Sequence, residues 1–189
     1  RKYGWPTHER QAYRYFVGNG IPKLVERLTP ADQRTPAVLE VALADFKRDY
    51  GQHLRDTTAP YPGIPEMLAK LKANGVQLAV FSNKADALAK EVVKDYFGTQ
   101  YFTIVRGQMT GVAPKPAAEG TNALLQALHA DPASTLYVGD SNVDVETAHN
   151  ANLPCCGAVW GFRTREELNA AGAEYLAENS DELYDVIMK

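Results

Sequence analysis

The chain has 189 residues, of which 45% are hydrophobic and 23% are charged, and its net charge is −3. This length predicts one domain, or one domain with a small appendage, and the apolar fraction suffices for a sizeable core. Basic residues are scattered, so the chain has no electrostatic footprint for nucleic acid or anionic lipid, and we expect neither as a partner. No apolar run approaches the roughly 20 residues that cross a bilayer.

The opening residues and the cysteines bear on the cellular compartment. The first 16 residues, RKYGWPTHERQAYRYF, lack the apolar segment of a secretory signal. Cys155 and Cys156 are adjacent, which rarely allows a disulfide, so we expect two small, buried apolar side chains. With only four scattered histidines beside them, we do not expect a zinc site. We therefore predict a reduced, cytoplasmic protein.

Residues 1–59 carry the patterns of helices only. Thr7 is a candidate N-cap for a first helix, and apolar spacing predicts a second helix over residues 21–28. Thr29-Pro30 has the form of an N-cap followed by proline, and the apolar face of a longer helix then extends to Tyr50. We therefore predict an all-helical unit. Four aromatic residues near its start either pack within it, which we favour, or form a contact surface: Trp5, Tyr13, Tyr15 and Phe16.

After Ala59, strand and helix patterns alternate. Short apolar runs predict strands over residues 76–81, 101–105, 136–138 and 156–160. Helical patterns cover residues 65–74, 83–97, 117–129 and 143–150, and cap signals at Thr164 and Ser180 open two more helices. Strands that alternate with helices imply parallel strands with helices on both faces. We therefore predict an α/β fold, with a Rossmann-like parallel sheet, over residues 60–189.

Polar clusters follow several of these strands, at the edge of the sheet where open α/β folds bind ligands. Ser82 and Asn83 could form a small anion site with the N–H groups at a helix start, or simply cap that helix. Lys115 lies between Pro114 and Pro116, which restrict the backbone around it. Its ammonium could therefore neutralise a phosphate as a fixed point charge, or remain a solvated loop lysine.

A third cluster consists of Asp140 and Asp144. Gly139 gives the chain freedom to turn after the strand, and Asp144 lies about one turn into the next helix. The two carboxylates can therefore converge on one point, and carboxylate oxygens suit Mg²⁺, which usually keeps water and a substrate phosphate as ligands. The alternative is a helix cap with a favourable charge at the helix N-terminus. We expect the pair to bind Mg²⁺.

Taken in this order, FSNK, PKP and VGDSNVDVETAHNA resemble the second, third and fourth motifs of the haloacid dehalogenase-like superfamily of phosphohydrolases. The resemblance covers essentially the whole chain. YRYFVGNG, FSNKA and VWGFR are similar to bacterial phosphoglycolate phosphatases and their relatives. The resemblance implies that Ser82, the Asn83 backbone and Lys115 surround a phosphoryl group, and that Asp140 and Asp144 hold Mg²⁺.

The resemblance also implies a mobile helical cap over residues 1–59, with a substrate loop over residues 17–23. Gly18 permits close approach of the backbone, and Asn19 and Lys23 are candidates to contact the non-phosphate end of a substrate. A plain helix–helix turn is the alternative. The GNG sequence lacks the rest of a Gly-x-Gly-x-x-Gly pattern, so we reject a dinucleotide site.

The family's first motif, Asp-x-Asp-Gly-Thr, does not occur in the sequence. In the family its first aspartate attacks phosphorus and its second is the general acid and base. The resemblance places this motif on a central strand between the strands at residues 76–81 and 136–138. We expect roughly 20 to 30 further residues upstream. Without them we expect two half-sheets with unpaired backbone groups, and no turnover.

The resemblance implies Mg²⁺-dependent hydrolysis of a small, soluble phosphate monoester, with 2-phosphoglycolate as the leading candidate. A pyrophosphatase and a sugar-phosphate mutase of the same family are alternatives. A non-catalytic module that binds a phosphate ligand is a further alternative from another class. The expected partner is a small phosphorylated metabolite, and the sequence leaves monomer and homodimer open.

Overall fold

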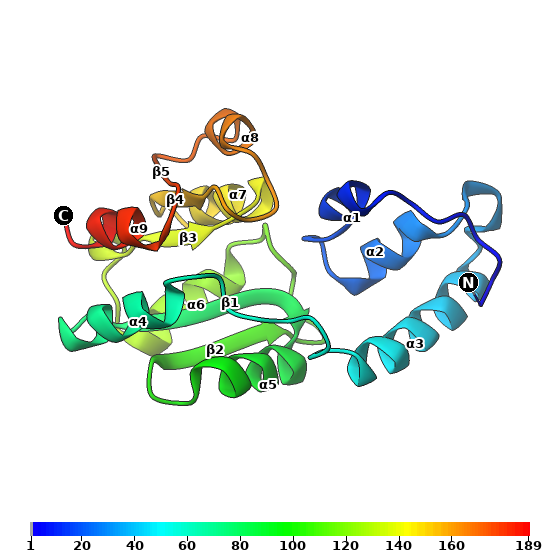
Figure 1. The fold of residues 1–189 in the computed structure, drawn as a ribbon, viewed down its shortest axis with the longest axis horizontal. Helices are drawn as coiled ribbons and strands as arrows, with labels where there is room; N and C mark the ends of the chain where they lie inside the picture. Colours follow the sequence, from blue (N-terminus) through cyan, green and yellow to red (C-terminus); the bar gives the residue numbers. More distant parts are fainter. Residues whose placement is uncertain (1) are drawn as a thin grey trace. The chain divides into compact units, whose positions relative to one another are not determined.

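The computed structural model describes residues 2–189, and the chain divides into two compact units (Figure 1). The first unit ends at Thr58 and the second extends from Ala59 to Lys189. Within residues 2–189, no helix combines the length and the apolar character needed to cross a membrane.

The first unit is helical throughout its described residues. Its elements are α1 (Arg10–Phe16), α2 (Ile21–Leu28), the 3₁₀ turn η1 (Ala31–Gln33) and α3 (Pro36–Gln52). The N-cap of the long helix was predicted at Thr29, which is wrong. Thr35 is the N-cap, since its hydroxyl accepts from Val38 N, and α3 begins at Pro36. Thr29 instead donates its hydroxyl to Val25 O at 2.8 Å and is the buried C-cap residue of α2. Similarly, α1 begins after Glu9 rather than after Thr7.

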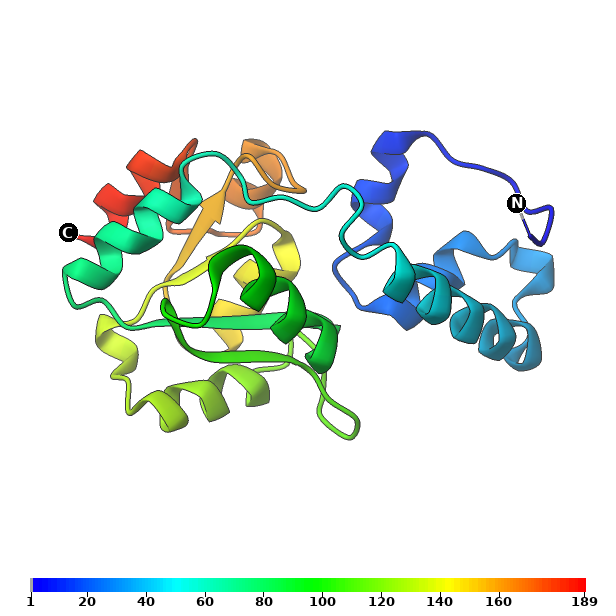
Figure 2. The same ribbon diagram turned by 60° about the horizontal axis from the view of Figure 1, so that its bottom comes forward.

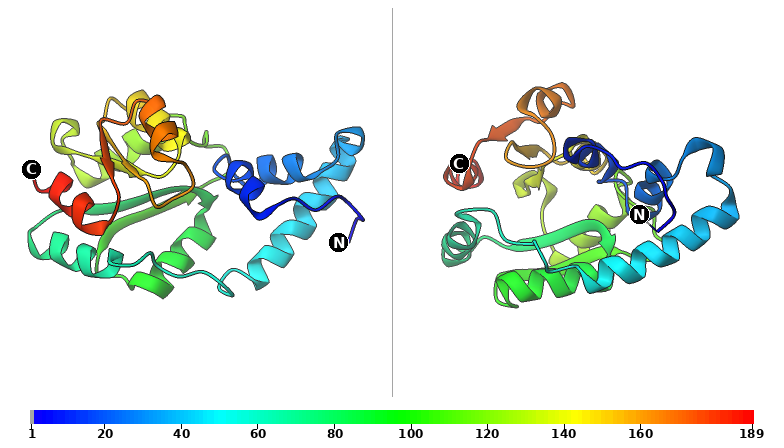
Figure 3. Two further views of the ribbon diagram at one scale, coloured as in Figure 1. Left: turned by 45° about the horizontal axis from the view of Figure 1, so that its top comes forward. Right: turned by 45° about the vertical axis from the view of Figure 1, so that its right-hand side comes forward.

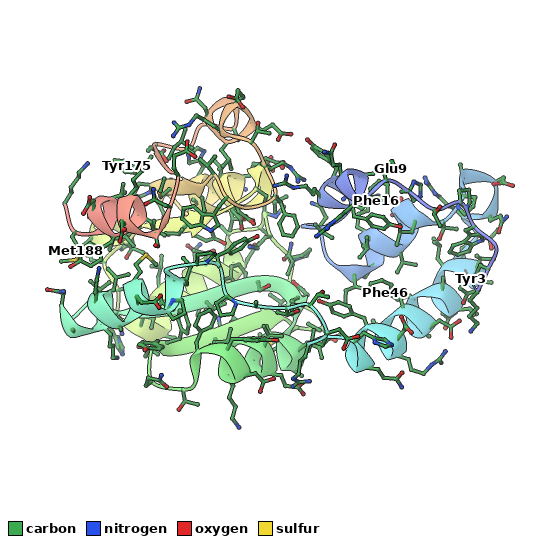
Figure 4. The ribbon with its side chains drawn as sticks, viewed as in Figure 1. Tyr3, Glu9, Phe16, Phe46, Tyr175 and Met188 are labelled. Carbon is green, nitrogen blue, oxygen red and sulfur yellow. The ribbon has the colours of Figure 1, made fainter. Side chains whose placement is uncertain are left out.

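The aromatic residues near the start of this unit fall into two groups. Trp5 stacks on Tyr3, with ring centroids 4.5 Å apart, and the Phe16 ring meets the edge of His8 at 5.0 Å. Figure 4 labels Tyr3 and Phe16. Tyr13 also meets the rings of His8 and Phe16 edge-on, at 6.1 and 5.7 Å between centroids, whereas Tyr15 is 51% exposed, so internal packing of Tyr15 was wrongly expected.

The second unit alternates strands and helices. Its elements are α4 (Ile64–Ala73), β1 (Leu78–Ala85), α5 (Asp86–Phe97), β2 (Phe102–Gln108), α6 (Glu119–Leu128), the 3₁₀ turn η2 (Pro132–Ser134), β3 (Tyr137–Gly139), α7 (Asn142–Asn150), β4 (Cys155–Ala158), α8 (Arg165–Ala170), β5 (Tyr175–Ala177) and α9 (Ser180–Ile187). Every strand pairing is parallel. The predicted α/β fold is confirmed, and β5 is the strand that the sequence did not predict.

The strands form two separate sheets within the described residues. β1 pairs with β2, whereas β3, β4 and β5 form a sheet in that order. In Figure 1, β1 and β3 are the strands of the two sheets that face each other. Each is hydrogen-bonded to one neighbouring strand only, so one edge of β1 and one edge of β3 are unpaired.

Helices cover both faces of the strands, and the two cysteines mark these faces. Cys155 is part of an apolar cluster with side chains of α6, α7 and α8, whereas Cys156 packs against α4 and α9. Figures 2 and 3 show α4 and α9 side by side on their face. Adjacent residues of a strand point to opposite faces, so these contacts place one helix layer on each side. Both thiols are free and fully buried, which confirms their expected apolar role.

Two of the three predicted helix caps in this unit differ from the structure. Thr164 and Glu167 do form the predicted capping box of α8. The last helix is capped by Asn179, whose Oδ1 accepts from Asp181 N and Glu182 N, and not by Ser180. Asn83 lies within β1 and does not cap α5.

Candidate phosphate and metal site

The end of β1 leaves the regular ladder where the first polar cluster begins. Phe81 pairs with Arg106 and Ala85 pairs with Gln108, so residues 82–84 lie opposite Gly107 alone. A Cβ on Gly107 would lie 2.4 Å from Lys84 O, which explains the glycine at this position. Within the bulge, the Ser82 hydroxyl accepts from Lys84 N at 3.1 Å. Its own hydrogen is therefore available to donate to an anion.

Asn83 joins this bulge to the loop that carries Lys115. Asn83 Oδ1 accepts from Lys115 N at 2.8 Å, and Asn83 Nδ2 donates to Lys115 O at 3.2 Å. The amide thus satisfies both backbone polar groups of Lys115, as a neighbouring strand would. The Asn83 side chain, which the sequence suggested as a helix cap, holds the lysine loop instead.

The ammonium of Lys115 is buried among one carboxylate and two aromatic rings. Lys115 Nζ lies 2.6 Å from Asp144 Oδ1, and both side chains are about 10% exposed. Nζ also lies 5.9 Å from the centre of the Phe81 ring and 6.0 Å from that of Tyr137. Burial is the largest single influence and favours the neutral amine, but the charge and hydrogen bond of Asp144 together with the interactions of Tyr137 outweigh it, so the pKa of Lys115 is raised. The lysine therefore remains a cation at neutral pH.

Asp144 is held by groups on three sides. Its Oδ2 accepts from Ser141 Oγ at 2.7 Å, from Ser141 N at 3.1 Å and from Asp140 N at 3.2 Å. Ser141 and Asp144 form a capping box at the start of α7. A Cβ on Gly139 would lie 2.1 Å from Asp144 Cβ. The glycine is therefore needed to leave space for the Asp144 side chain. The sequence had instead suggested that Gly139 allows the chain to turn.

Asp140 begins the turn after β3 and is enclosed by the loop after β4. Phe162 N donates to Asp140 Oδ2 at 3.2 Å, and Arg163 N donates to Asp140 O at 3.1 Å. A Cβ on Gly161 would lie 2.1 Å from Asp140 Cβ, so the loop approaches closely only through a glycine. Burial, together with the negative charge of Asp144, raises the pKa of Asp140.

The donor set at this edge fits part of a magnesium site. Asp140 is a half-buried carboxylate with like charge beside it, which favours a cation at its oxygens. Asp144 is already bonded to Lys115 and Ser141, so it orients this edge and is less open to a metal. No group of three His, Cys, Asp or Glu side chains within residues 2–189 gathers around one point. The described chain thus offers one well-placed carboxylate ligand.

The loop between α1 and α2 contains the remaining residues that the sequence suggested. Gly18 and Gly20 have φ values of 105° and 84°, which glycine adopts readily. Between them, Asn19 Oδ1 accepts from Arg27 Nη2 at 2.9 Å. Lys23 Nζ is paired with both Glu26 oxygens at 2.8 Å, so its charge is balanced locally.

Several contacts of the site could not be recognised in the sequence. Phe81 and Tyr137 were assigned to buried strands by their apolar character, and nothing indicated that their rings flank Lys115. Arg27 had no signal beyond its place on an amphipathic helix. Gly161 is the exception, because it lies in VWGFR, a stretch that the sequence analysis had already noted for its resemblance to the family.

The family model described as haloacid dehalogenase-like hydrolase matches residues 1–158. The chain belongs to this family. The resemblance noted in the motifs is therefore confirmed.

Curated relatives from bacteria agree with this assignment. The chain is 31% identical to a phosphoglycolate phosphatase of Aquifex aeolicus (strain VF5) over 147 residues, which are 78% of this chain and 67% of the relative. It is 31% identical over 169 residues to a plasmid phosphoglycolate phosphatase of Cupriavidus necator, covering 89% of this chain and 73% of that protein. The chain thus spans about two thirds to three quarters of these relatives.

Two solved structures illustrate the shared fold. A family hydrolase from Streptococcus pneumoniae superposes with a TM-score of 0.86 at 19% identity, over 98% of this chain and 84% of that one. CbbY from Rhodobacter sphaeroides, solved in complex with phosphate, has a TM-score of 0.74 at 22% identity, over 96% and 84% of the two chains. At these identities the likeness concerns the fold alone.

Proposed function

We propose that the protein containing this chain hydrolyses a small phosphate monoester with the help of Mg²⁺, and that 2-phosphoglycolate is its leading substrate. The observation that carries the proposal is the network Ser82–Asn83–Lys115–Asp144–Asp140, which links the polar ends of β1 and β3 through the loop that carries Lys115. The choice of 2-phosphoglycolate as the substrate is supported by the curated relatives that bear the name phosphoglycolate phosphatase.

In this proposal, the side chains of the chain stabilise charge on the transferring phosphoryl group. The Ser82 hydroxyl donates to one phosphoryl oxygen, and the backbone N–H of Asn83 donates to the same anion. Lys115, kept cationic by Asp144, balances the charge that spreads over the oxygens. Fixed donors and charges of this kind supply most of what catalysis of phosphoryl transfer requires.

Asp140 would hold the Mg²⁺ ion, with Asp144 fixing Asp140 through its backbone N–H. Bound Mg²⁺ would offset the negative charge shared by the phosphate and the carboxylates. Asn83 does not touch phosphate with its side chain in this scheme; it keeps Lys115 in place.

The nucleophile would come from a strand outside residues 1–189 that pairs with β1 and β3. The unpaired edges of these two strands support this proposal, as does the 40% exposure of Val138 in the middle of β3. An aspartate at the end of that strand would attack phosphorus and form an aspartyl-phosphate while the ester oxygen leaves with a proton from a second carboxyl group. Water would then attack phosphorus, releasing phosphate and restoring the carboxylate.

The proposal is tested by measuring phosphate release by the full-length protein from a panel of phosphate esters, with Mg²⁺ and with EDTA. The panel contains 2-phosphoglycolate, a sugar phosphate and pyrophosphate. We expect turnover of 2-phosphoglycolate that needs Mg²⁺ and that falls at least about a hundredfold in Lys115→Met. Preference for pyrophosphate would identify a pyrophosphatase instead, and conversion of the sugar phosphate to an isomer would identify a mutase. Absence of hydrolysis in every case would reject the enzymatic proposal.

A further inference from the structure

The loop between β4 and α8 holds Asp140 at two points. Phe162 N donates to Asp140 Oδ2 at 3.2 Å, and Arg163 N donates to Asp140 O at 3.1 Å. Two successive N–H groups of one loop thus bind the side chain and the backbone of the same aspartate. The carboxylate of Asp140 cannot turn about its side-chain bonds without losing its hydrogen bond to the loop.

The loop is itself tied to the elements around it. Val159 N donates to Ala177 O of β5 at 3.0 Å, and Gly161 N donates to Ala158 O of β4 at 3.2 Å. Thr164, the residue that follows the loop, is the N-cap of α8 and forms its capping box. These bonds fix the loop at both ends, so its N–H groups are held in place before any ligand binds.

The close approach of the loop to Asp140 depends on Gly161. A Cβ at this position would lie 2.1 Å from Asp140 Cβ and 2.4 Å from Asp140 Oδ2. Gly161 is not among the glycines of positive φ in residues 2–189, so its backbone conformation does not require glycine. The glycine is there for space, and even a methyl group would push the loop and the carboxylate apart.

The hydrogen bond from Phe162 distinguishes the two oxygens of the Asp140 carboxylate. Oδ2 is directed at the loop, and Oδ1 therefore points in another direction. Carboxylates that bind metals are commonly hydrogen-bonded by groups behind them, which fix the orientation of the ligand oxygen. The neighbouring carboxylate is used differently, because Asp144 Oδ1 pairs with Lys115 and Asp144 Oδ2 accepts from Ser141.

We propose that residues 161–163 are a positioning element, which keeps Asp140 Oδ2 on the Phe162 N–H and so presents Asp140 Oδ1 to Mg²⁺. This inference rests on the proposed function and names the residues that tune its metal site. The element acts through Asp140 and contacts neither the metal nor the substrate. Gly161 makes the contact possible, and Phe162 acts through its backbone.

The first test measures the binding of Mg²⁺ alone to the full-length protein by titration calorimetry. Gly161→Ala should raise the Kd for Mg²⁺ roughly tenfold to a hundredfold, because the displaced carboxylate no longer presents a fixed oxygen. Gly51→Ala is the matched control, since Gly51 also lacks a positive φ and a Cβ there would meet nothing within 4 Å. Its Kd should stay within about twofold of the wild-type value. An unchanged Kd in Gly161→Ala would overturn the inference and leave the proposed function in place.

Thermal unfolding separates positioning of the metal ligand from a general effect on the fold. Mg²⁺ should raise the Tm of the wild type above its value in EDTA, because it binds the folded state. This rise should be clearly smaller in Gly161→Ala than in the wild type and in Gly51→Ala. A Tm that is lower in Gly161→Ala by the same amount with Mg²⁺ and with EDTA would show a structural role only, against the inference.

Amide hydrogen exchange of the full-length protein tests the hydrogen bond itself and does not depend on Gly161→Ala. The Phe162 N–H should be protected both with and without Mg²⁺, because the metal uses the other oxygen. In Asp140→Ala it should exchange at least about tenfold faster, whereas the Arg163 N–H, which is bonded to the backbone oxygen of residue 140, should stay protected.

Two outcomes of these experiments have different meanings. Loss of Phe162 protection on addition of Mg²⁺ would show that the metal takes Oδ2, and would overturn the inference alone. A wild-type full-length protein that binds no Mg²⁺ would reject the metal-dependent function that we propose, and the positioning role with it.

Discussion

At Asn83, a single amide joins the bulge of β1 to the Lys115 loop, 32 residues farther along the chain. It satisfies both the N–H and the C=O of Lys115, and Lys115 in turn meets Asp144 at 2.6 Å. The position of the buried ammonium therefore depends on a side chain that has no charge of its own. This dependence makes Asn83 the residue at which the site is most easily disturbed without removing a charged group.

Asn83→Ala leaves the two backbone groups of Lys115 without partners, which we expect to cost about 1–3 kcal/mol of unfolding free energy. Displacement of the ammonium by about 1 Å should also lower kcat about tenfold to a hundredfold. Steady-state kinetics and urea unfolding of the full-length protein check both effects. Asn74→Ala is the matched control, because Asn74 also bonds a backbone oxygen, Lys70 O at 2.9 Å, and is the C-cap residue of α4.

A test of Asn83→Ala in a Lys115→Ala protein shows whether Asn83 acts through Lys115. If Asn83 acts through Lys115, then adding Asn83→Ala to a Lys115→Ala protein should change kcat by less than about twofold. A further large loss in that background would mean that Asn83 contacts the substrate directly, against the geometry described here.

At the scale of elements, the junction between α5 and β2 depends on a carboxylate. Asp86, the first residue of α5, accepts from Gly107 N at 2.9 Å and pairs with Lys90 Nζ at 2.7 Å. The hydrogen bond from Lys90, and then that from Gly107 N–H, lower the pKa of Asp86. A lowered folded-state pKa means that the carboxylate stabilises the fold above its ordinary pKa of 3.8. That stabilisation is lost as the pH falls through the lower, folded value.

We therefore predict that Asp86→Asn is less stable than the wild type by about 1 kcal/mol near pH 7. The difference should shrink as the pH falls from about 5 to about 2, because the wild-type carboxylate becomes protonated. Urea unfolding across this range measures both curves. A constant difference at every pH would show that Asp86 stabilises the junction without its charge.

The existence and the order of the elements could be predicted, whereas several of their ends could not. Short apolar runs marked four of the five strands, because a strand covered on both faces needs a continuous apolar stretch. The end of β1 and the cap of α3 were missed, since Asn83 bonds Lys115 and Thr29 turns back onto Val25. The first of these contacts is distant in sequence, and the second competes locally with capping.

The candidate site divides in the same way. Ser82, Lys115 and Asp140 follow strands in chain order, so a parallel sheet places them at one edge and the sequence could suggest them together. The partners that hold these residues come from elsewhere in the unit, as Phe162 does for Asp140. Their identity depends on packing, which a single sequence does not reveal.

At the scale of the whole molecule, the two sheets of the second unit are joined by side chains and not by backbone hydrogen bonds. One apolar cluster combines Met67, Leu68 and Leu71 of α4 with Cys156 and Ala177 of the sheet formed by β3, β4 and β5. The unpaired edges of β1 and β3 remain a cost to the fold, since open edges also favour aggregation.

If a further strand pairs with both edges, the full-length protein should be markedly more stable than residues 1–189 alone. We expect its Tm to be higher by about 10 °C or more, because a central strand adds two ladders and covers Val138. Thermal unfolding followed by circular dichroism measures the difference. Equal Tm values for the two proteins would show that the edges are not paired by an added strand.

A crystal structure of the full-length protein with Mg²⁺ and tungstate as a phosphate mimic would show whether Ser82, Lys115 and Asp140 share one phosphate and metal site. We predict one anion within hydrogen-bonding distance of both Ser82 Oγ and Lys115 Nζ, and a metal ion on a carboxylate oxygen of Asp140. An anion bound elsewhere, with Lys115 bonded to Asp144 alone and no metal at Asp140, would contradict the account.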